Sequence, residues 1–576
     1  MQLEICNFKG SLTMKINTEF LNNLISQIST DQMMEHLQEF SRWKKLAGTK
    51  EEAQSLNYIR GVLDSYGLST TLLYHDAFIS LPEAAHLEFN GKRFKAITHS
   101  MALPTPEAGL TRKIVDLGSA SQATFNATDV RNQIVLIDGM ATPEMAKRCR
   151  HAGAVGQIHI SPHEYLHEMC LSPVWGNPDF ETVKNLPTSS AVTLSDEDGK
   201  KIREQLTITP DLPATIHAKV DTGWRKTPIL IADLEAKNAS EDAPYILFSG
   251  HHDTWYEGVM DNGSANATMM EVTRCMAKNR NAMKRHLRLC FWSGHSQGRY
   301  SGSTWFADKY WHELHRDCAV HVNVDSTGGE GNSLLSTAPA ATELSEFAQE
   351  VIKQNSGQGY DGNRMARNSD QSFWGIGIPS LFGILSCQPN ETVGVRNALG
   401  WWWHTPYDKI ERINPAFLLR DTQIYAHALA HLVSDPYLPL NIATQVADLL
   451  SNIAEIQLPS ECDLSLSVLH TEVKELHKEM VGFQEQRLES PEAYLKRDRT
   501  LMLVSRQLVP LDYTYGDQHS HDPALPLPKW PSLEPIRNLA GETRGADALR
   551  LHLGLATRSL NRLLSNVQIA RALVTA

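Results

Sequence analysis

The chain has 576 residues, which at roughly 150 residues per domain is enough for several domains. Its 41% hydrophobic and 21% charged residues lie close to the globular average, which excludes wholesale disorder, a fibrous repeat and a disulfide-stapled miniprotein. The formal net charge of −12 argues against nucleic acid as a partner, because the long-range field repels polyanions.

Membrane and disulfide classes are also disfavoured. No window reaches the ~18 consecutive apolar residues that a membrane span needs, and the start of the chain, MQLEICNFKG, lacks the layout of a signal peptide. We therefore expect no membrane partner and a cytoplasmic location. The 8 cysteines form no CxxC pair, so the sequence predicts neither a disulfide framework nor a thiolate metal site.

The first half of the chain divides into two predicted segments. Residues 1–110 hold a helix around residues 43–63, followed after Gly67 by a short strand at 69–74. Residues 111–220 change to short strand-like runs separated by turns, which is typical of a separate β-rich lobe.

The second half also divides into two predicted segments. Residues 221–438 alternate short apolar strands with helical stretches, which predicts an α/β core with a largely parallel sheet covered by helices. Residues 439–576 are predicted to be helical, and an apolar stripe from Leu549 to Ala570 recurs at steps of four and three. That stripe can pack within its own subunit or against a second copy. We expect a homodimer.

Histidine and aspartate side chains follow the ends of successive predicted core strands or lie close to them in the chain. They are His251, Asp253, Asp261, His295, Asp325 and His404. In an open α/β sheet, ligand-binding groups collect at the carboxyl ends of the strands. Imidazole nitrogen and carboxylate oxygen are ligands that zinc accepts, with cobalt, nickel or manganese as alternatives. Spacing alone does not decide between a metal site and structural histidines.

These residues also stand in motifs that resemble a known family. His251-x-Asp253, Asp261-Asn262-Gly263-Ser264-Ala265, Asp325 and His404-Thr405-Pro406-Tyr407-Asp408 resemble the zinc-dependent exopeptidases typified by aminopeptidase Y, glutamate carboxypeptidase II and the transferrin receptor. The resemblance implies a mixed sheet flanked by helices. It assigns residues 1–110 and 221–438 to the catalytic domain, 111–220 to an inserted protease-associated domain and 439–576 to a helical dimerisation domain.

The resemblance also implies roles for single residues. In that family two zinc ions share a bridging carboxylate, so His251 and Asp325 would hold one zinc, Asp261 would bridge and His404 would hold the other. The carboxylate of Asp253 would accept the N–H of His251 that does not face the metal, and so fix the tautomer of the imidazole. We therefore group Asp253 with the catalytic residues. The cofactor implied is one or two divalent transition metal ions per chain, zinc first.

One position departs from the family. Its members carry a Glu-Glu pair, the first a general base and the second a zinc ligand, where this chain has His295 and Ser296. Three outcomes stay open. His295 is the base, since an imidazole with a pKa near ~6.5 accepts a proton at neutral pH; or His295 ligates metal; or the second metal is lost.

Substrate-binding residues are predicted around the same strands. Trp403 precedes His404 within a run of three tryptophans, and aromatic walls suit an apolar or planar substrate. Trp403 also replaces a tyrosine that donates to the oxyanion in glutamate carboxypeptidase II, and Tyr300 or Tyr407 would substitute for it. Arg396, with Arg364 and Arg367, could clamp a carboxylate.

We therefore predict a metal-dependent hydrolase that cleaves amide or peptide bonds in a short peptide or a small amide metabolite, using metal-activated water. Serine chemistry fits less well, because the chain has no GxSxG elbow. The alternative is a catalytically inactive homologue that acts as a binding or scaffold protein, as the transferrin receptor does. The sequence does not identify the substrate or the bond cleaved.

Overall fold

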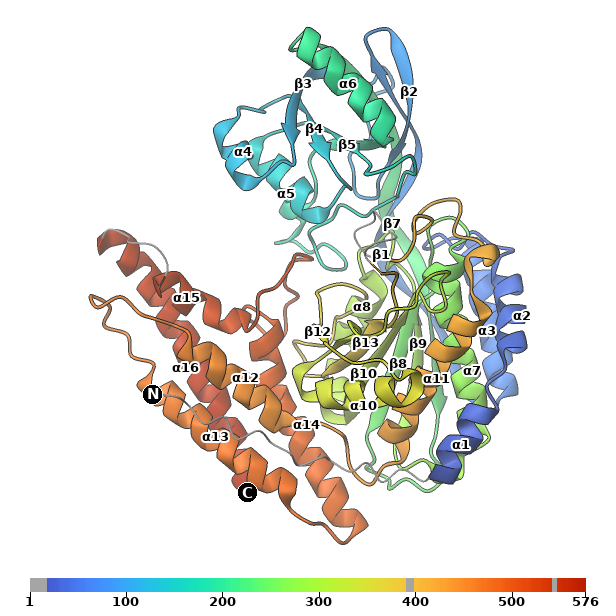
Figure 1. Cartoon of the computed structure of the whole chain (residues 1–576), viewed down its shortest axis with the longest axis vertical. Coiled ribbons are helices and arrows are strands. Elements are labelled where there is room, and N and C mark those ends of the chain that lie inside the picture. Colours follow the sequence, from blue (N-terminus) through green and yellow to red (C-terminus); the bar gives the residue numbers. More distant parts are fainter. Residues whose placement is uncertain (1–17, 390–397, 541–545) are drawn as a thin grey trace.

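The computed structural model describes residues 18–389, 398–540 and 546–576. They form three parts, an α/β core, a lobe that stands above it, and a group of C-terminal helices along one side (Figure 1). The described strands join in one continuous sheet that runs from the lobe into the core.

The core is built on strands that lie side by side and are largely buried, β7 only over residues 227–234. In spatial order they are β7 (Pro213–Leu234), β9 (His286–Trp292), β8 (Tyr245–His251), β10 (Cys318–Asp325) and β13 (Ser380–Ile384), with the short β11 (Pro339–Ala340) and β12 (Asn363–Arg364) at the edge. β9, β8, β10 and β13 run parallel, whereas β7 is antiparallel to β9. The predicted α/β sheet is therefore confirmed as a mixed sheet, and its parallel strands are covered on both faces.

Helices pack on both sides of this sheet (Figure 1). One face is covered by α1 (Thr18–Ser26), α2 (Thr30–Phe40), α3 (Lys50–Ser65), α7 (Ala265–Ala277), α10 (Ser345–Ser356) and α11 (Pro415–Ser434). The other face carries α8 (Ser301–Lys309) and α9 (Trp311–Asp317). The helix expected around residues 43–63 begins only at Lys50, after a Thr49 cap whose hydroxyl accepts the N–H of Glu52 at 3.3 Å.

A two-stranded ribbon carries the lobe. β1 (Ser69–Phe89) pairs antiparallel with β7 from Ser69 opposite Asp233 to Phe89 opposite Ala214. The strand expected at 69–74 is therefore much longer, because its partner satisfies the backbone where the side chains give no regular alternation. The ribbon connects the core to the lobe, which lies beyond the end of the core sheet (Figure 1).

The lobe itself is an α/β unit. Its strands are β2 (Lys92–Thr98), β3 (Leu110–Gly118), β4 (Ile134–Asp138), β5 (Gly156–Ile160) and β6 (Ser190–Leu194), of which β3 to β6 run parallel. Three helices accompany them, α4 (Gln122–Ala127), α5 (Pro143–Ala152) and α6 (Asp196–Ile208). The lobe has its own apolar core, which includes Ile134, Ile158 and Val192.

The C-terminal segment is helical, as expected. It consists of α12 (Ile442–Ala454), α13 (Ser467–Glu485), α14 (Pro491–Tyr513), α15 (Glu534–Ala540) and α16 (Ala546–Thr575). The apolar stripe of α16 is buried inside the chain, with Leu563, Val567 and Ala570 fully covered by this part of the structure. The stripe therefore no longer argues for a dimer, and the homodimer stays a prediction. None of the described helices is long and apolar enough to cross a membrane.

A buried ion pair ties α14 to the core. Arg285, just before β9, donates to the carboxylate of Asp498 and to the carbonyls of Leu432 and Asp435 at 3.0 Å each. We expect Asp498→Ala to lower the free energy of unfolding by about 3–5 kcal/mol, because it leaves a buried guanidinium without its counter-charge. Urea unfolding of the full chain, followed by circular dichroism, measures this loss.

The matched control is Asp547→Ala. Asp547 pairs with Arg550 at 3.0 Å on the surface of α16, where the aspartate side chain is 94% exposed. Exposed pairs contribute about 0–1 kcal/mol. A loss as small for Asp498→Ala as for this control would contradict the role given to the buried pair.

Candidate metal centre

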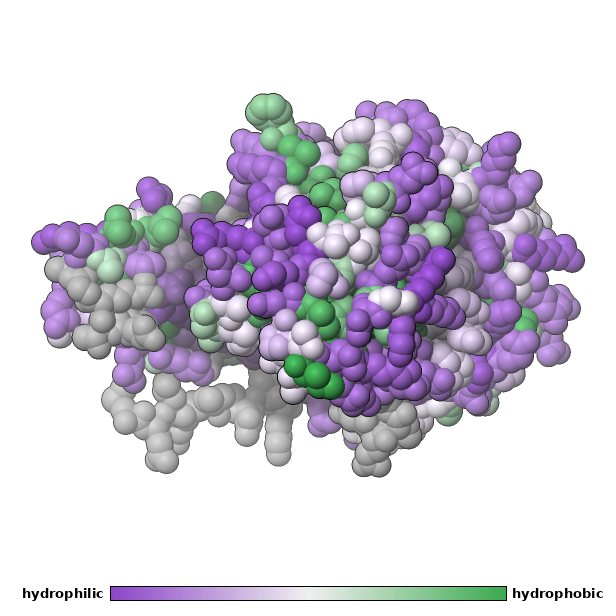
Figure 2. All heavy atoms as spheres, turned by 90° about the horizontal axis from the view of Figure 1, so that it is seen from above, coloured by the Kyte–Doolittle hydropathy of each residue, from purple (hydrophilic) through white to green (hydrophobic). Residues whose placement is uncertain are grey.

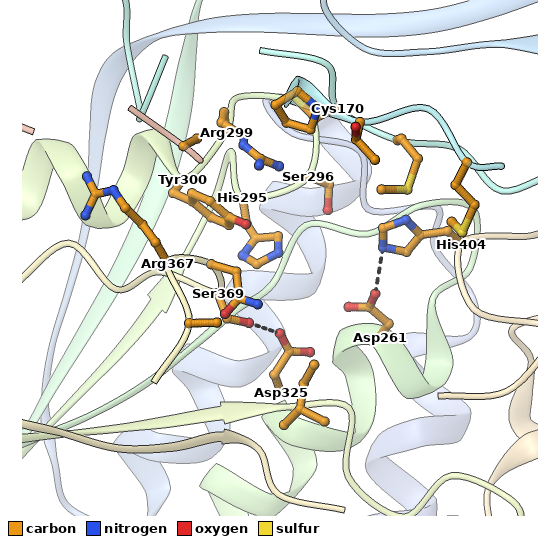
Figure 3. Close-up of a pocket in the computed structure, with 18 of the residues that line it drawn as sticks. Cys170, Asp261, His295, Ser296, Arg299, Tyr300, Asp325, Arg367, Ser369 and His404 are labelled. Atoms are coloured by element: carbon orange, nitrogen blue, oxygen red, sulfur yellow. Dashed lines mark hydrogen bonds and ion pairs between the residues drawn. The ribbon is translucent and has the colours of Figure 1, made fainter. Parts of the chain in front are cut away.

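The predicted polar residues meet at one edge of the core sheet. His251 is the last residue of β8, Asp325 is the last residue of β10, and His295 follows β9 by three residues. Because β8, β9 and β10 are parallel, their carboxyl ends face the same side. Asp261, in the segment Val259–Ser264 before α7 where its own backbone is not helical, and His404, in the loop beyond β13, point into the same space (Figure 3).

Asp261 lies between two histidines. Its Oδ1 is 3.1 Å from Nε2 of His251, and its Oδ2 is 3.1 Å from Nε2 of His404. Nε2 of His251 also lies 3.9 Å from Oδ1 of Asp325. These four side chains are at most 11% exposed. One carboxylate therefore presents a separate oxygen to each of two imidazoles.

The atoms at this point fit a divalent cation. Nε2 of His251 and Oδ1 of Asp261 are both buried and, although close, make no hydrogen bond with each other or with any other described group. Buried polar atoms are almost always satisfied. A metal ion held by both would satisfy them, and ligand atoms of His251, His295 and Asp325 lie within 4.8 Å of one another.

The charges around these atoms favour ligation. Burial opposes ionisation of Asp261, but His251 and His404 overcome it and hold the pKa of this carboxyl far below its usual range. Burial likewise disfavours a charged His251, yet Asp261 and Asp325 raise the pKa of its imidazole well above 6.5. The carboxylate stays ionised at neutral pH, as a ligand must. A metal ion would take the place of the proton on His251.

Backbone carbonyls fix both histidines. Nδ1 of His251 is 2.8 Å from the carbonyl oxygen of Asp253, and Nδ1 of His404 is 2.7 Å from that of Glu168. Donation from Nδ1 leaves the lone pair of Nε2 facing Asp261. The role expected of the Asp253 carboxylate is therefore wrong in detail. It accepts the N–H groups of His295 and Ser296, at 3.1 and 2.8 Å, and so is not available to His251.

His295 is held by the carboxylate of Asp370, a residue for which the sequence predicted no individual role. Its Nδ1 is 2.7 Å from Oδ2 of Asp370, whose Oδ1 accepts the hydroxyl of Ser303 at 2.7 Å. Burial acts against ionisation of Asp370, but His295 outweighs it and lowers the pKa of this carboxyl. The ring of His295 stacks on His251 at a centroid distance of 3.6 Å and an angle of 14°. Its Nε2 remains for a substrate or a water.

Asp325 and Ser296 are two further polar residues that line the cavity. Asp325 accepts the hydroxyl of Ser326 at 2.9 Å and also that of Ser369 (Figure 3). Ser296 faces the same cavity, and its buried hydroxyl has no hydrogen-bond partner among the described residues.

These groups open into a cavity of about 380 Å³. All three parts of the structure contribute to its wall. The lobe supplies Met140, Thr142, Pro143, Glu144, Met169 and Cys170, and the C-terminal segment supplies Ala524, Leu525 and Pro526. The lobe and the irregular stretch before α15 therefore help to shape the space above the candidate metal ligands.

The predicted substrate residues divide into two groups. Tyr300 and Trp403 line the cavity, with Tyr300 edge-on to His295 at 4.8 Å and Trp403 stacked on His404 at 3.5 Å. Tyr407 does not line it, because its ring packs against Trp401 and is 51% exposed. Arg396 lies outside the described residues.

The arginines behave differently from the prediction. Arg364 pairs with Asp512 of α14 at 2.6 Å, and Arg367 donates to the carbonyl of Pro523 at 2.9 Å, so both attach the C-terminal segment. Arg367 also lines the cavity (Figure 3). Arg299 lines it too, forms no ion pair with any described carboxylate, and has a buried Nε without a partner among the described groups. Sequence reasoning missed it, although it stands only four residues after His295.

The fold and the side chains at the strand ends define the zinc-exopeptidase type of metallopeptidase. Residues 230–429 match the model of peptidase family M28, so the chain contains a domain of that family. The aminopeptidase YwaD of Bacillus subtilis is 25% identical over 371 residues, 62% of this chain and 74% of that protein. A putative endoplasmic reticulum metallopeptidase 1-B of Caenorhabditis elegans is 24% identical over 245 residues.

Solved structures share the fold. A zinc aminopeptidase from Bacillus subtilis superposes with a TM-score of 0.55 at 22% identity, over 71% of this chain and 96% of the other. An aminopeptidase from an Aneurinibacillus strain gives 0.55 at 18% identity, over 72% and 96%. The sequence match spans 25% of the worm protein and 42% of a probable glutamate carboxypeptidase VP8 from Zea mays. The comparisons support a metallopeptidase hydrolase.

Proposed function

We propose that this protein is a metal-dependent hydrolase of amide or peptide bonds in which His295 replaces the glutamate base of its relatives. The observation that carries the proposal is Asp261, whose two oxygens each lie 3.1 Å from the Nε2 of a buried histidine. Such a carboxylate is suited to hold metal between the strand ends. The direct test is release of amine from short peptides and N-acylated amino acids by the metal-loaded chain.

His251, Asp261 and Asp325 would hold the more tightly bound ion, zinc by preference for this donor set. A divalent ion there polarises the scissile carbonyl and makes water more acidic. His404 and Asp261 offer a second position, which lacks the carboxylate that Ser296 replaces. We infer one tightly held ion per chain and a weaker second position.

His295 would take the proton from the attacking water. Its Nδ1–H donates to Asp370 at 2.7 Å, which fixes the tautomer and leaves a basic Nε2. The same contact holds the ring nearly parallel to that of His251, 3.6 Å away, so the two imidazoles would not both direct a lone pair at one ion without turning. The pinned ring therefore favours the base role over ligation. Asp370 also stabilises the imidazolium that forms, and His295 can then return the proton to the leaving amine.

Arg299 suggests that the substrate carries a carboxylate. Its guanidinium lies over the ring of Tyr300 at 5.1 Å and beside the cavity, without an acidic partner among the described side chains (Figure 3). A cation without its counter-charge in a partly buried site is suited to bind an anion. Trp403 and the apolar wall from the lobe would contact the rest of the substrate.

We expect Arg299→Leu to raise the KM for substrates with a free carboxylate by about 10–100-fold, the cost of losing a charge-assisted hydrogen bond of about 1.5–3 kcal/mol. The kcat should change little, since the residue binds rather than reacts. Steady-state kinetics with matched peptide acids and peptide amides measures this. Arg558→Leu, at an exposed site on α16, is the control. An equal change in KM for acids and amides would contradict the role.

A further inference from the structure

A second group of potential metal ligands lies on the ribbon, away from the strand ends of the core. His86 of β1 stands directly opposite His217 of β7. Glu88 follows two residues after His86 and therefore projects from the same face of β1. The three residues lie in the part of the ribbon that belongs to the lobe, because β2 pairs with β1 from Ala85 to Phe89 and β3 pairs with β7 at Ile216.

Their distances fit a metal site that needs small adjustments. Nε2 of His86 is 3.6 Å from Oε1 of Glu88, and Nε2 of His217 is 3.8 Å from Oε2. One ligand atom from each residue lies within 4.8 Å of the others. Tetrahedral zinc with bonds of about 2.0–2.1 Å places its ligands about 3.3 Å apart. The two histidine–glutamate distances would therefore shorten by about 0.3–0.5 Å, and the two imidazole ligand atoms, which lie within 4.8 Å of one another, would also have to approach.

Nε2 of His217 is buried and has no hydrogen-bond partner among the described residues, and its ring lies in a confined position. The backbone of Gly109, at φ +79°, lies against the same ring, where a Cβ would come within 2.9 Å of Nε2. A side chain there would collide with the imidazole, and Gly109 leaves just enough space for the ring.

We propose that His86, Glu88 and His217 form a divalent transition-metal site, zinc or a metal of similar preference, with water as the fourth ligand. Such an ion would cross-link β1 and β7 where they carry the lobe. The two imidazoles now stack 4.2 Å apart and 5° from parallel, so they must splay for the metal to lie in both ring planes. Both imidazole side chains are 20–23% exposed, so part of each ring faces solvent.

Arg93 opposes metal binding at this site, so its substitution provides a test of the proposal. Its Nη2 donates to Nδ1 of His86 at 3.2 Å. A neutral imidazole that binds metal through Nε2 carries its proton on Nδ1 and cannot accept that hydrogen bond. Metal binding must therefore break the contact with Arg93 and place a second positive charge close to it. Arg93→Ser removes both penalties.

The experiment uses the full chain with His251→Ala and Asp261→Asn, which removes ligands of the core centre. Zinc is titrated against a fluorescent chelator, and cobalt absorption reports four-coordinate binding. We expect one zinc per chain that depends on the ribbon. His217→Ala and Glu88→Gln should each weaken it by at least the ~10–100-fold that losing a supporting partner costs. Arg93→Ser should tighten it by about 2–10-fold, the worth of one hydrogen bond.

The control is His151→Ala, at an exposed histidine of α5 in the same lobe. It should leave zinc affinity unchanged. Glu88→Gln keeps the side chain's shape and so preserves the test if His217→Ala fails to fold. Absence of bound zinc, or zinc binding that survives both Glu88→Gln and His217→Ala, would overturn the proposal. Weaker binding by Arg93→Ser would also count against it.

Discussion

Asp261→Asn should release the tightly held metal and reduce hydrolysis to the level of a blank reaction. The substitution keeps the shape of the side chain but removes the charge that lies 3.1 Å from both His251 and His404. Because even partners that only orient ligands cost ~10–100-fold in affinity, we expect the loss of this central ligand to exceed ~100-fold. Metal analysis after gel filtration and amide hydrolysis with saturating zinc are the two measurements.

Asp211→Asn is the matched control, because Asp211 is a lobe residue with a 69% exposed side chain. Its metal content and its activity should equal those of the unaltered chain. Circular dichroism separates loss of the metal from loss of the fold. If Asp261→Asn retained stoichiometric metal and full turnover, the assignment of Asp261 between two histidines as the central ligand would be wrong.

His295→Ala should lower kcat by ~10²–10⁴ while the metal stays bound, since general base catalysis contributes about that factor. Asp370→Asn should cause a smaller loss of ~10–100-fold, because it removes only the group that orients the imidazole. Both effects should appear in kcat more than in KM.

Metal analysis distinguishes the roles open to His295. If the imidazole were a ligand, His295→Ala would lose metal and turnover together. If it were structural, metal and turnover would both persist. The ring is pinned by Asp370 and stacked on His251 at 3.6 Å, so we expect the remaining outcome, in which turnover falls and metal remains.

The sequence was a good guide to where the strands end and therefore to the site. Parallel strands bring their carboxyl ends to one edge, so polar residues directly after apolar runs had to converge there. This rule alone was enough to predict that His251 and Asp325 lie at the site. Asp261 and His404 lie in loops, and they were found through motifs rather than periodicity.

Contacts between distant segments were not predictable in the same way. Asp370 stands 75 residues from His295, and no local pattern indicates that the two side chains meet. The cavity wall at Ala524–Pro526 comes from a Pro-rich stretch without periodic signal, which Arg367 holds in place through the carbonyl of Pro523. Arg364 was misread as substrate-binding because its buried partner, Asp512, lies on a helix of another segment.

Hydrolysis by metal-free and metal-restored protein tests the central proposal most directly. The full chain is stripped with a chelator, dialysed, and assayed on short peptides and N-acylated amino acids before and after one equivalent of zinc, cobalt or manganese. We predict no turnover without metal and recovery with at least one of these ions, lost again in Asp261→Asn. Turnover that persists without metal would contradict the account, and so would metal-loaded protein that binds these amides but cleaves none of them.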